Sequence, residues 1–173
     1  MSRRAVFFDR DGTLMEEVQY CSDPALVKVF PSVPEALDSL RAAGVAIVVV
    51  SNQSGIGRGL FTEEQYRAVQ TEFLRQIGNG RIDASYYCPD APGTASPCRK
   101  PEPGMLLDAA RNLDLELAKS WMIGDKAADI ECGKRAGTRT ILVRTGYGAE
   151  QRCEPDFTAA DAGEAARIVL QRL

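Results

Sequence analysis

The chain has 173 residues, of which 45% are hydrophobic and 26% charged, which predicts a single globular domain over residues 1–173. Its 24 acidic and 21 basic residues give a net charge of −3, so it lacks the basic character of a general nucleic-acid-binding protein. Histidine is absent from the sequence, which excludes Ser-His-Asp triads, Cys-His dyads and every histidine-ligated zinc site.

The N-terminal segment and the cysteines favour a reducing location. The first residues, MSRRAVFFDRDG, lack the apolar stretch of a signal peptide, and no apolar run approaches the roughly 18 residues of a membrane span. The five cysteines are an odd number at irregular spacing, which argues against a disulfide framework. We therefore expect a soluble cytoplasmic protein with reduced thiols and no membrane partner.

Short apolar runs alternate with amphipathic stretches from the start of the chain. The runs at 5–8 and 45–50 predict buried strands, because uninterrupted apolar segments are typical of parallel sheets. A helix is expected between them, over 33–43. Ser32 and Glu35 have the spacing of a capping box at its start.

The next stretch predicts a second helix and a third strand. The helix is expected over 62–77, opened by a capping box of Thr62 and Gln65. The segment SGIGRG, at 54–59, predicts a flexible loop before this helix. The segment ASYYC, at 84–88, predicts the third strand.

The second half of the chain continues the alternation. Pro103 is expected to open a helix through GMLLDAARNL, because proline suits a first helical turn. The other predicted elements are strands at 121–123, 140–143 and 156–159 and helices at 127–136 and 161–172. Strands that alternate with helices predict an α/β fold with a doubly wound parallel sheet.

Three predicted strands end in polar residues. Asp9 follows the first, Ser51 the second and Asp125 the one at 121–123. In open parallel sheets, ligands bind beyond the carboxyl ends of the strands. Each residue alone could be a helix cap or a turn residue. Their coincidence at three strand ends favours one shared site.

Several carboxylates would meet at this site, namely those of Asp9, Asp11, Asp125 and Asp129. Their repulsion would raise their pKa values unless a cation lay among them. Oxygen ligands without histidine favour Mg²⁺ over zinc or copper. With Mg²⁺ present, one carboxylate could attack a phosphate ester to form an aspartyl-phosphate, while a second acid transfers protons.

The segments DRDGTL, VVVSNQSGIGRG, CRKPEPGML and MIGDKAADI occur in this order and resemble the haloacid dehalogenase (HAD) superfamily of phosphatases. The resemblance covers nearly the whole chain. It is strongest to the subfamily of heptose bisphosphate 7-phosphatases and histidinol-phosphatase domains. It implies a HAD-like Rossmannoid fold and a Mg²⁺-dependent phosphomonoesterase. The implied substrate is D-glycero-D-manno-heptose 1,7-bisphosphate, which loses its 7-phosphate, and histidinol phosphate is the alternative.

The resemblance also implies roles for individual residues. Asp9 would be the nucleophile and Asp11 the general acid and base. Ser51 would donate a hydrogen bond to the phosphoryl group, and Lys100 would stabilise both nucleophile and phosphate. Asp9, Asp125 and the backbone carbonyl of Asp11 would surround Mg²⁺.

Further positions are implied to bind water or substrate. Asp129 would hold a metal-bound water. Arg58 could reach a distal anionic group or belong to a plain connector, and Tyr20 could contact a sugar or pack on its neighbours. The implied substrate-binding residues are Ser51, Asn52, Gln53, Ser54, Arg99, Lys100 and Lys126.

One loop departs from the subfamily pattern, which is Cys-x-His followed by Cys-x-Cys before Arg-Lys-Pro and binds zinc. Here Cys88 and Cys98 remain, but Asp90 stands in place of histidine and Ser96 in place of a cysteine. Two thiolates with one carboxylate are a poor tetrahedral zinc set. We therefore expect no zinc, and a loop held by packing and by its prolines.

Many superfamily members carry a cap domain over the site, but here predicted elements fill both places where a cap could be inserted. We expect no cap domain, an open crevice and, from the closest relatives, a monomer. A non-catalytic module that binds a phosphorylated ligand is the alternative class. Such a module should have lost Asp9, Asp11 or Lys100, and all three are present.

Overall fold

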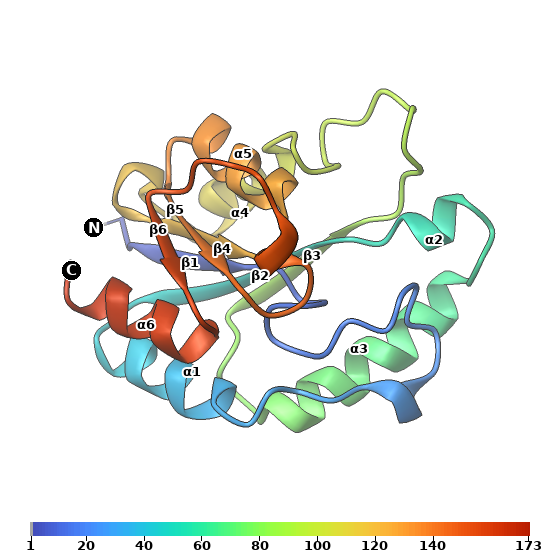
Figure 1. The fold of residues 1–173 in the computed structure, drawn as a ribbon, viewed down its shortest axis with the longest axis horizontal. Coiled ribbons are helices and arrows are strands. Elements are labelled where there is room, and N and C mark those ends of the chain that lie inside the picture. The colour runs from blue at the N-terminus through green and yellow to red at the C-terminus, as the bar shows by residue number, and fades with distance from the viewer. Residues whose placement is uncertain (1) are drawn as a thin grey trace.

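The computed structural model describes residues 2–173 and is built around one parallel sheet (Figure 1). Its six strands lie in the order β3-β2-β1-β4-β5-β6, and every neighbouring pair is parallel. The strands are β1 (Ala5–Phe8), β2 (Ala46–Asn52), β3 (Ala84–Cys88), β4 (Trp121–Gly124), β5 (Arg139–Val143) and β6 (Phe157–Ala159). This topology confirms the predicted doubly wound α/β fold.

Helices cover both faces of the sheet. Alternate residues of β1 point to opposite faces, and both faces are buried, as in parallel sheets flanked by helices. Val6 and Phe8 join the core beneath α1, α3 and α6, whereas Ala5 and Phe7 join the core beneath α4 and α5 (Figure 1). The helices are α1 (Val33–Ala42), α2 (Ser54–Gly57), α3 (Glu63–Ile77), α4 (Gly104–Leu113), α5 (Ala127–Ala136) and α6 (Ala162–Leu170).

The two predicted capping boxes have different outcomes. At α3, the Thr62 side chain accepts from the Gln65 backbone and the Gln65 side chain accepts from the Thr62 backbone, which confirms the prediction. At α1 the prediction is wrong. Within residues 2–173, the Ser32 side chain makes no capping hydrogen bond. The reason is that Ser32 has helical backbone angles, φ −77° and ψ −13°, whereas a capping residue is extended.

The end of β2 also departs from prediction. The strand continues through Ser51 and Asn52, because their backbones pair with Tyr87 and Cys88 of β3. The predicted flexible loop at 54–59 instead begins with the helical turn α2. The backbone N–H of Gly57 in this turn donates to the carbonyl of Pro89 at 2.9 Å, which ties α2 to the segment after β3.

The cysteines correct another prediction. Cys88 and Cys98 form a disulfide, so the expectation of reduced thiols throughout is wrong for this pair. The segment after β3 turns back on itself and brings the two Cα atoms to 5.6 Å, which the spacing along the chain did not reveal. Cys21, Cys132 and Cys153 are free, as expected.

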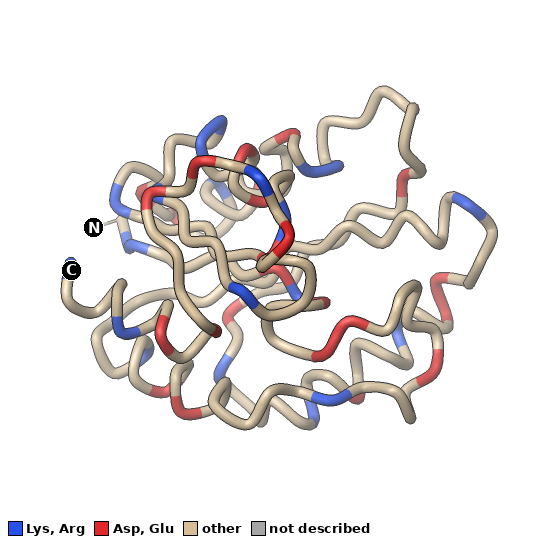
Figure 2. The backbone as a smooth tube through the Cα atoms, in the orientation of Figure 1, with Lys and Arg blue, Asp and Glu red and all other residues tan. Residues whose placement is uncertain are grey.

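Three further features bear on function. In the described range 2–173, α1 and a loop lie between β1 and β2, and α2 and α3 lie between β2 and β3, so no separate cap domain is present. No helix of these residues combines the length and the apolar character that a membrane crossing requires. Lysines and arginines are interspersed with acidic residues over the backbone (Figure 2).

Candidate active site

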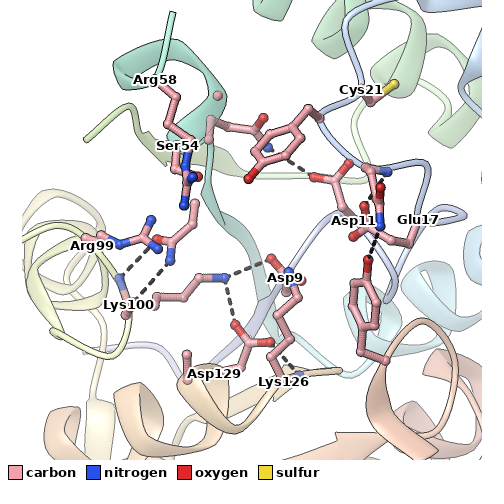
Figure 3. A pocket seen from close by; sticks show the side chains of 17 residues that line it. Asp9, Asp11, Glu17, Cys21, Ser54, Arg58, Arg99, Lys100, Lys126 and Asp129 are labelled. Carbon is pink, nitrogen blue, oxygen red and sulfur yellow. Dashed lines mark hydrogen bonds and ion pairs between the residues drawn. The ribbon is translucent and has the colours of Figure 1, made fainter. Parts of the chain in front are cut away.

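A cavity of about 410 Å³ lies at the carboxyl edge of the sheet (Figure 3). It forms where Asp9 follows β1, where β2 ends at Asn52 and where α5 begins beside Asp129. The predicted residues that line it are Asp9, Asp11, Asn52, Gln53, Ser54, Arg99, Lys100, Lys126 and Asp129, and Tyr20 and Arg58 line it as well. Of the three polar residues predicted at strand ends, Asp9 lines the cavity, whereas Ser51 and Asp125 are buried and are not part of its lining.

Lys100 links two of the carboxylates (Figure 3). Its Nζ lies 2.8 Å from Asp9 Oδ1 and 2.7 Å from Asp129 Oδ1, and it also donates to the carbonyl of Val50 at 2.9 Å. The residue is only 4% exposed. Burial disfavours its charge, but the carboxylates of Asp129 and Asp9 outweigh that effect and raise the pKa of Lys100. Its ammonium group thus places a positive charge beside Asp9.

Asp9, Asp125 and Asp129 form a buried acidic cluster, with one oxygen of each within 4.8 Å of the others. Burial, with Asp9 and Asp129 nearby, raises the pKa of Asp125 to about 8. Burial, with Asp9 nearby, raises the pKa of Asp129 to about 6. Among residues 2–173, Asp125 Oδ1 has no hydrogen-bond partner although it is buried. An unpartnered oxygen among crowded carboxylates fits a hard divalent cation such as Mg²⁺.

The Asp11 side chain lies outside this cluster, contrary to the expectation that all four carboxylates crowd together. Arg10 binds both of its oxygens, Nε to Oδ2 at 3.1 Å and Nη2 to Oδ1 at 3.2 Å. Gln53 Nε2 donates to Oδ2 at 3.0 Å. These contacts turn the carboxylate away from the acidic cluster, because two donors satisfy it there. A role for the Asp11 backbone carbonyl as a metal ligand stays a prediction.

Sequence reasoning missed Arg10 and the helix α3 residues that support it. The Arg10 guanidinium is fully buried, donates to Gln70 Oε1 at 3.1 Å and lies 5.6 Å from the centre of the Tyr66 ring. The available signal was an arginine between two acids directly after a buried strand. Its partners on α3 could not be read from local spacing, because they are distant in sequence.

Ser51 and Asn52 take different places at the end of β2. Ser51 Oγ is buried and accepts from Gln53 Nε2 at 3.0 Å. Asn52 holds the backbone of Lys100 at two points, since its Oδ1 accepts from the Lys100 N–H at 3.0 Å and its Nδ2 donates to the Lys100 carbonyl at 3.1 Å. Asn52 therefore fixes the position of Lys100 as well as lining the cavity.

Two arginines stand at one end of the cavity (Figure 3). Burial and the nearby Arg58 charge lower the pKa of Arg99. The Arg58 guanidinium also lies 5.9 Å from the centre of the Tyr20 ring, so Tyr20 both lines the cavity and packs on a neighbour. Two like charges held together form a site that favours an anion.

The segment after β3 places Cys88, Asp90, Ser96 and Cys98 together. Ligand atoms of Cys88, Asp90 and Cys98 lie within 4.8 Å of one another. However, the two sulfurs are bonded to each other, and zinc binds thiolates. The residues in this state do not fit the zinc site of the subfamily. The expectation that the loop holds no zinc stays a prediction.

Known proteins resemble this chain over most of its length. Residues 97–165 match the HAD-hydrolase-like family model. D-glycero-beta-D-manno-heptose-1,7-bisphosphate 7-phosphatase from Photorhabdus laumondii is 39% identical over 98% of this chain and 90% of its own. The D-glycero-D-manno-heptose-1,7-bisphosphate 7-phosphatase of Chlorobaculum tepidum is 36% identical over 95% and 92%.

Solved structures agree with the sequence relatives. The crystal structure of D,D-heptose 1,7-bisphosphate phosphatase from B. bronchiseptica, complexed with magnesium and phosphate, matches with a TM-score of 0.90 and 30% identity over 98% of this chain and 99% of that one. The D,D-heptose 1,7-bisphosphate phosphatase from Burkholderia thailandensis matches with a TM-score of 0.73 and 30% identity over 98% and 100%.

Proposed function

The chain belongs to the heptose 1,7-bisphosphate 7-phosphatase family of HAD phosphatases, and on that premise we propose that it removes the 7-phosphate of D-glycero-D-manno-heptose 1,7-bisphosphate through an aspartyl-phosphate at Asp9. The observation that carries this proposal is the contact of Lys100 with Asp9 beside the acidic cluster. This contact places the carboxylate of Asp9, which would be the nucleophile, next to the positive charge of Lys100 and next to the site where the acidic cluster would bind a cation.

The chain's own residues account for both chemical steps. Asp9 attacks phosphorus and the sugar oxygen leaves, while Lys100 and Ser51 hold the phosphoryl oxygens and Asp11 donates a proton to the leaving oxygen. Asp11 then takes a proton from water, whose oxygen attacks phosphorus and releases phosphate from Asp9. Mg²⁺, held by Asp9, Asp125 and the Asp11 carbonyl, would neutralise the repulsion between carboxylate and phosphate.

The arginine pair supports a bisphosphate over histidinol phosphate. Arg58 and Arg99 lie at the same end of the cavity, where an anionic group of the substrate would offset their mutual repulsion. The second phosphate of the heptose supplies such a group. Histidinol phosphate would instead bring an ammonium group toward the arginines, which is unfavourable. Asn52, Gln53, Ser54 and Lys126 would contact the sugar portion.

The test is a phosphate-release screen in the presence of Mg²⁺. It compares both anomers of heptose 1,7-bisphosphate with histidinol phosphate and common sugar phosphates. We expect the highest kcat/KM for one heptose anomer and no release after removal of Mg²⁺ with a chelator. A higher kcat/KM for histidinol phosphate would contradict the proposed substrate and identify the protein as a histidinol-phosphate phosphatase. No hydrolysis of any ester despite bound Mg²⁺ would support a binding module.

We also propose that residues 1–173 act as one phosphatase domain and as a monomer. The single continuous sheet supports the first point. Size-exclusion chromatography with light scattering tests the oligomeric state, and a dimer would contradict the proposal.

A further inference from the structure

The segment from Cys88 to Cys98 connects the end of β3 to Arg99. We propose that the Cys88–Cys98 disulfide, together with Ser96 and Asp90, is a positioning element that holds Arg99 at the substrate cavity without a metal ion. The inference rests on the proposed function, because it treats Arg99 as a substrate-binding residue.

The disulfide lies at the centre of a small polar cluster. Ser96 Oγ is 3.4 Å from Cys88 Sγ and 3.3 Å from Cys98 Sγ, and it donates to Asp90 Oδ2 at 2.6 Å. Cys88 is fully buried in the core beneath α4 and α5. One end of the crosslink is therefore anchored in the rigid interior, and the other end directly precedes Arg99.

Arg99 is attached to this cluster at two points. Its backbone N–H donates to Ser96 Oγ at 3.3 Å, and its Nη1 donates to the carbonyl of Asp90 at 3.4 Å. Both acceptors belong to the loop that the disulfide closes. The guanidinium nevertheless lines the cavity near Arg58, whose charge repels it. The closed loop therefore opposes a displacement that this repulsion favours.

Lys100, the next residue, is held by other means. Asn52 binds its backbone N–H and carbonyl, and Asp9, Asp129 and the Val50 carbonyl bind its ammonium group. None of these contacts, all within residues 2–173, involves the segment 88–98. Opening the loop should therefore displace Arg99 and leave the catalytic lysine in place. The expected consequence is weaker substrate binding with nearly unchanged turnover.

Reduction opens the crosslink by thiol–disulfide exchange. A dithiol such as dithiothreitol supplies two electrons and two protons, the S–S bond breaks, and Cys88 and Cys98 become thiols while the reagent becomes a cyclic disulfide. The same structural change can be made permanent by replacing both cysteines with alanine. Reduction and the double substitution should change KM and kcat to the same extent.

The experiment measures KM and kcat for the wild type, the double variant Cys88→Ala/Cys98→Ala and the control Cys153→Ala, each with and without dithiothreitol. Cys153 is a free, half-buried cysteine outside the cavity. For heptose 1,7-bisphosphate we expect KM to rise about tenfold in the double variant and in reduced wild type, with kcat within about twofold. The double variant should not respond to dithiothreitol, and the control should behave as wild type.

A second ester separates positioning from general damage. For p-nitrophenyl phosphate, which lacks a distal anion, KM should change by less than about twofold in the double variant. An equal loss with both esters, or a loss of kcat with unchanged KM, would overturn the inference. So would alkylation and intact-mass analysis that finds both thiols free in protein purified without reductant, or stoichiometric zinc in that protein.

Failure of the proposed function would be visible separately. In that case the wild type would not hydrolyse heptose 1,7-bisphosphate in either redox state. The comparison of KM would then be made with the bisphosphate or phosphomonoester that the wild type hydrolyses best. Equal KM values in wild type and double variant would still contradict the positioning role.

Discussion

Arg10 is fully buried and binds both carboxylate oxygens of its neighbour Asp11, at 3.1 and 3.2 Å. Gln70 and the Tyr66 ring, both on α3, hold the guanidinium from the other side. A buried charge needs such compensation, because an unpaired one is strongly destabilising. The consequence is that α3, a helix remote in sequence from the DRDGTL segment, fixes the orientation of the proposed acid and base.

Replacing this arginine should impair turnover more than binding. In Arg10→Lys, the charge remains, but an ammonium group cannot bind both carboxylate oxygens in a planar fork. We expect kcat to fall about 10- to 100-fold and KM to change little, measured by phosphate release. Arg67→Lys, an exposed position on α3, is the matched control and should keep wild-type kinetics. A folded Arg10→Lys enzyme with wild-type kcat would show that Arg10 is not needed to orient Asp11.

Asp9 and Asp11 should differ in the step that their loss blocks. Asp9→Asn keeps the size of the side chain but removes the nucleophile, so kcat should fall at least about a thousandfold with the fold intact. With p-nitrophenyl phosphate, whose leaving group needs little protonation, Asp11→Asn should retain attack on phosphorus and slow the release of phosphate from Asp9. Intact-mass analysis after an acid quench should therefore detect phosphoenzyme in Asp11→Asn alone. Substantial residual turnover in Asp9→Asn would contradict covalent catalysis at that residue.

The sequence predicted the parts of the site that depend on strand order and not those that depend on loop paths. Asp9 and Asp125 follow apolar runs, and the parallel topology requires the ends of those strands to meet at one edge. The disulfide depends on how the segment after β3 turns back, and the burial of Arg10 depends on where α3 packs. Ser32 failed as a cap because its own backbone is helical, which residue type alone does not determine.

Gly12 should be essential to the cation site. It has φ +83°, and a Cβ there would collide with the Asp125 carboxylate. Gly44 is a matched control, because it has φ +77° but nothing lies within 4 Å of its Cβ position. Both alanine variants bear a left-handed backbone cost of roughly 1–2 kcal/mol. Only Gly12→Ala should also lose more than about tenfold in Mg²⁺ affinity by calorimetry. Equal Mg²⁺ affinity in the two variants would contradict this account.

Removal of Mg²⁺ should make stability fall as the pH rises. Burial and neighbouring carboxylates raise the pKa of Asp125 to about 8 and of Asp129 to about 6, above their values in the unfolded chain. The metal-free folded state therefore binds more protons than the unfolded state, and this stabilisation is lost as the pH rises through those values.

Thermal unfolding of chelator-treated protein should show a decreasing Tm between about pH 6 and about pH 8. Saturating Mg²⁺ should remove most of the decrease, because the cation replaces the protons, and the apparent Mg²⁺ affinity should rise over the same interval. A metal-free Tm that increases across this interval would show that Asp125 and Asp129 are ionised without the cation.

Arg58 should contribute to recognition of the second phosphate and not to the reaction at the first. Its side chain lines the cavity beside Arg99 but is largely exposed, so solvent screens its charge and the effect should be moderate. Arg58→Gln should raise KM for heptose 1,7-bisphosphate about 3- to 10-fold and leave kcat and the KM for p-nitrophenyl phosphate nearly unchanged. Added salt should reduce the difference in KM between wild type and variant.

Arg111→Gln, at an exposed position on α4, is the matched control and should keep wild-type KM values. A parallel rise of KM for both esters would place Arg58 at the reacting phosphate instead.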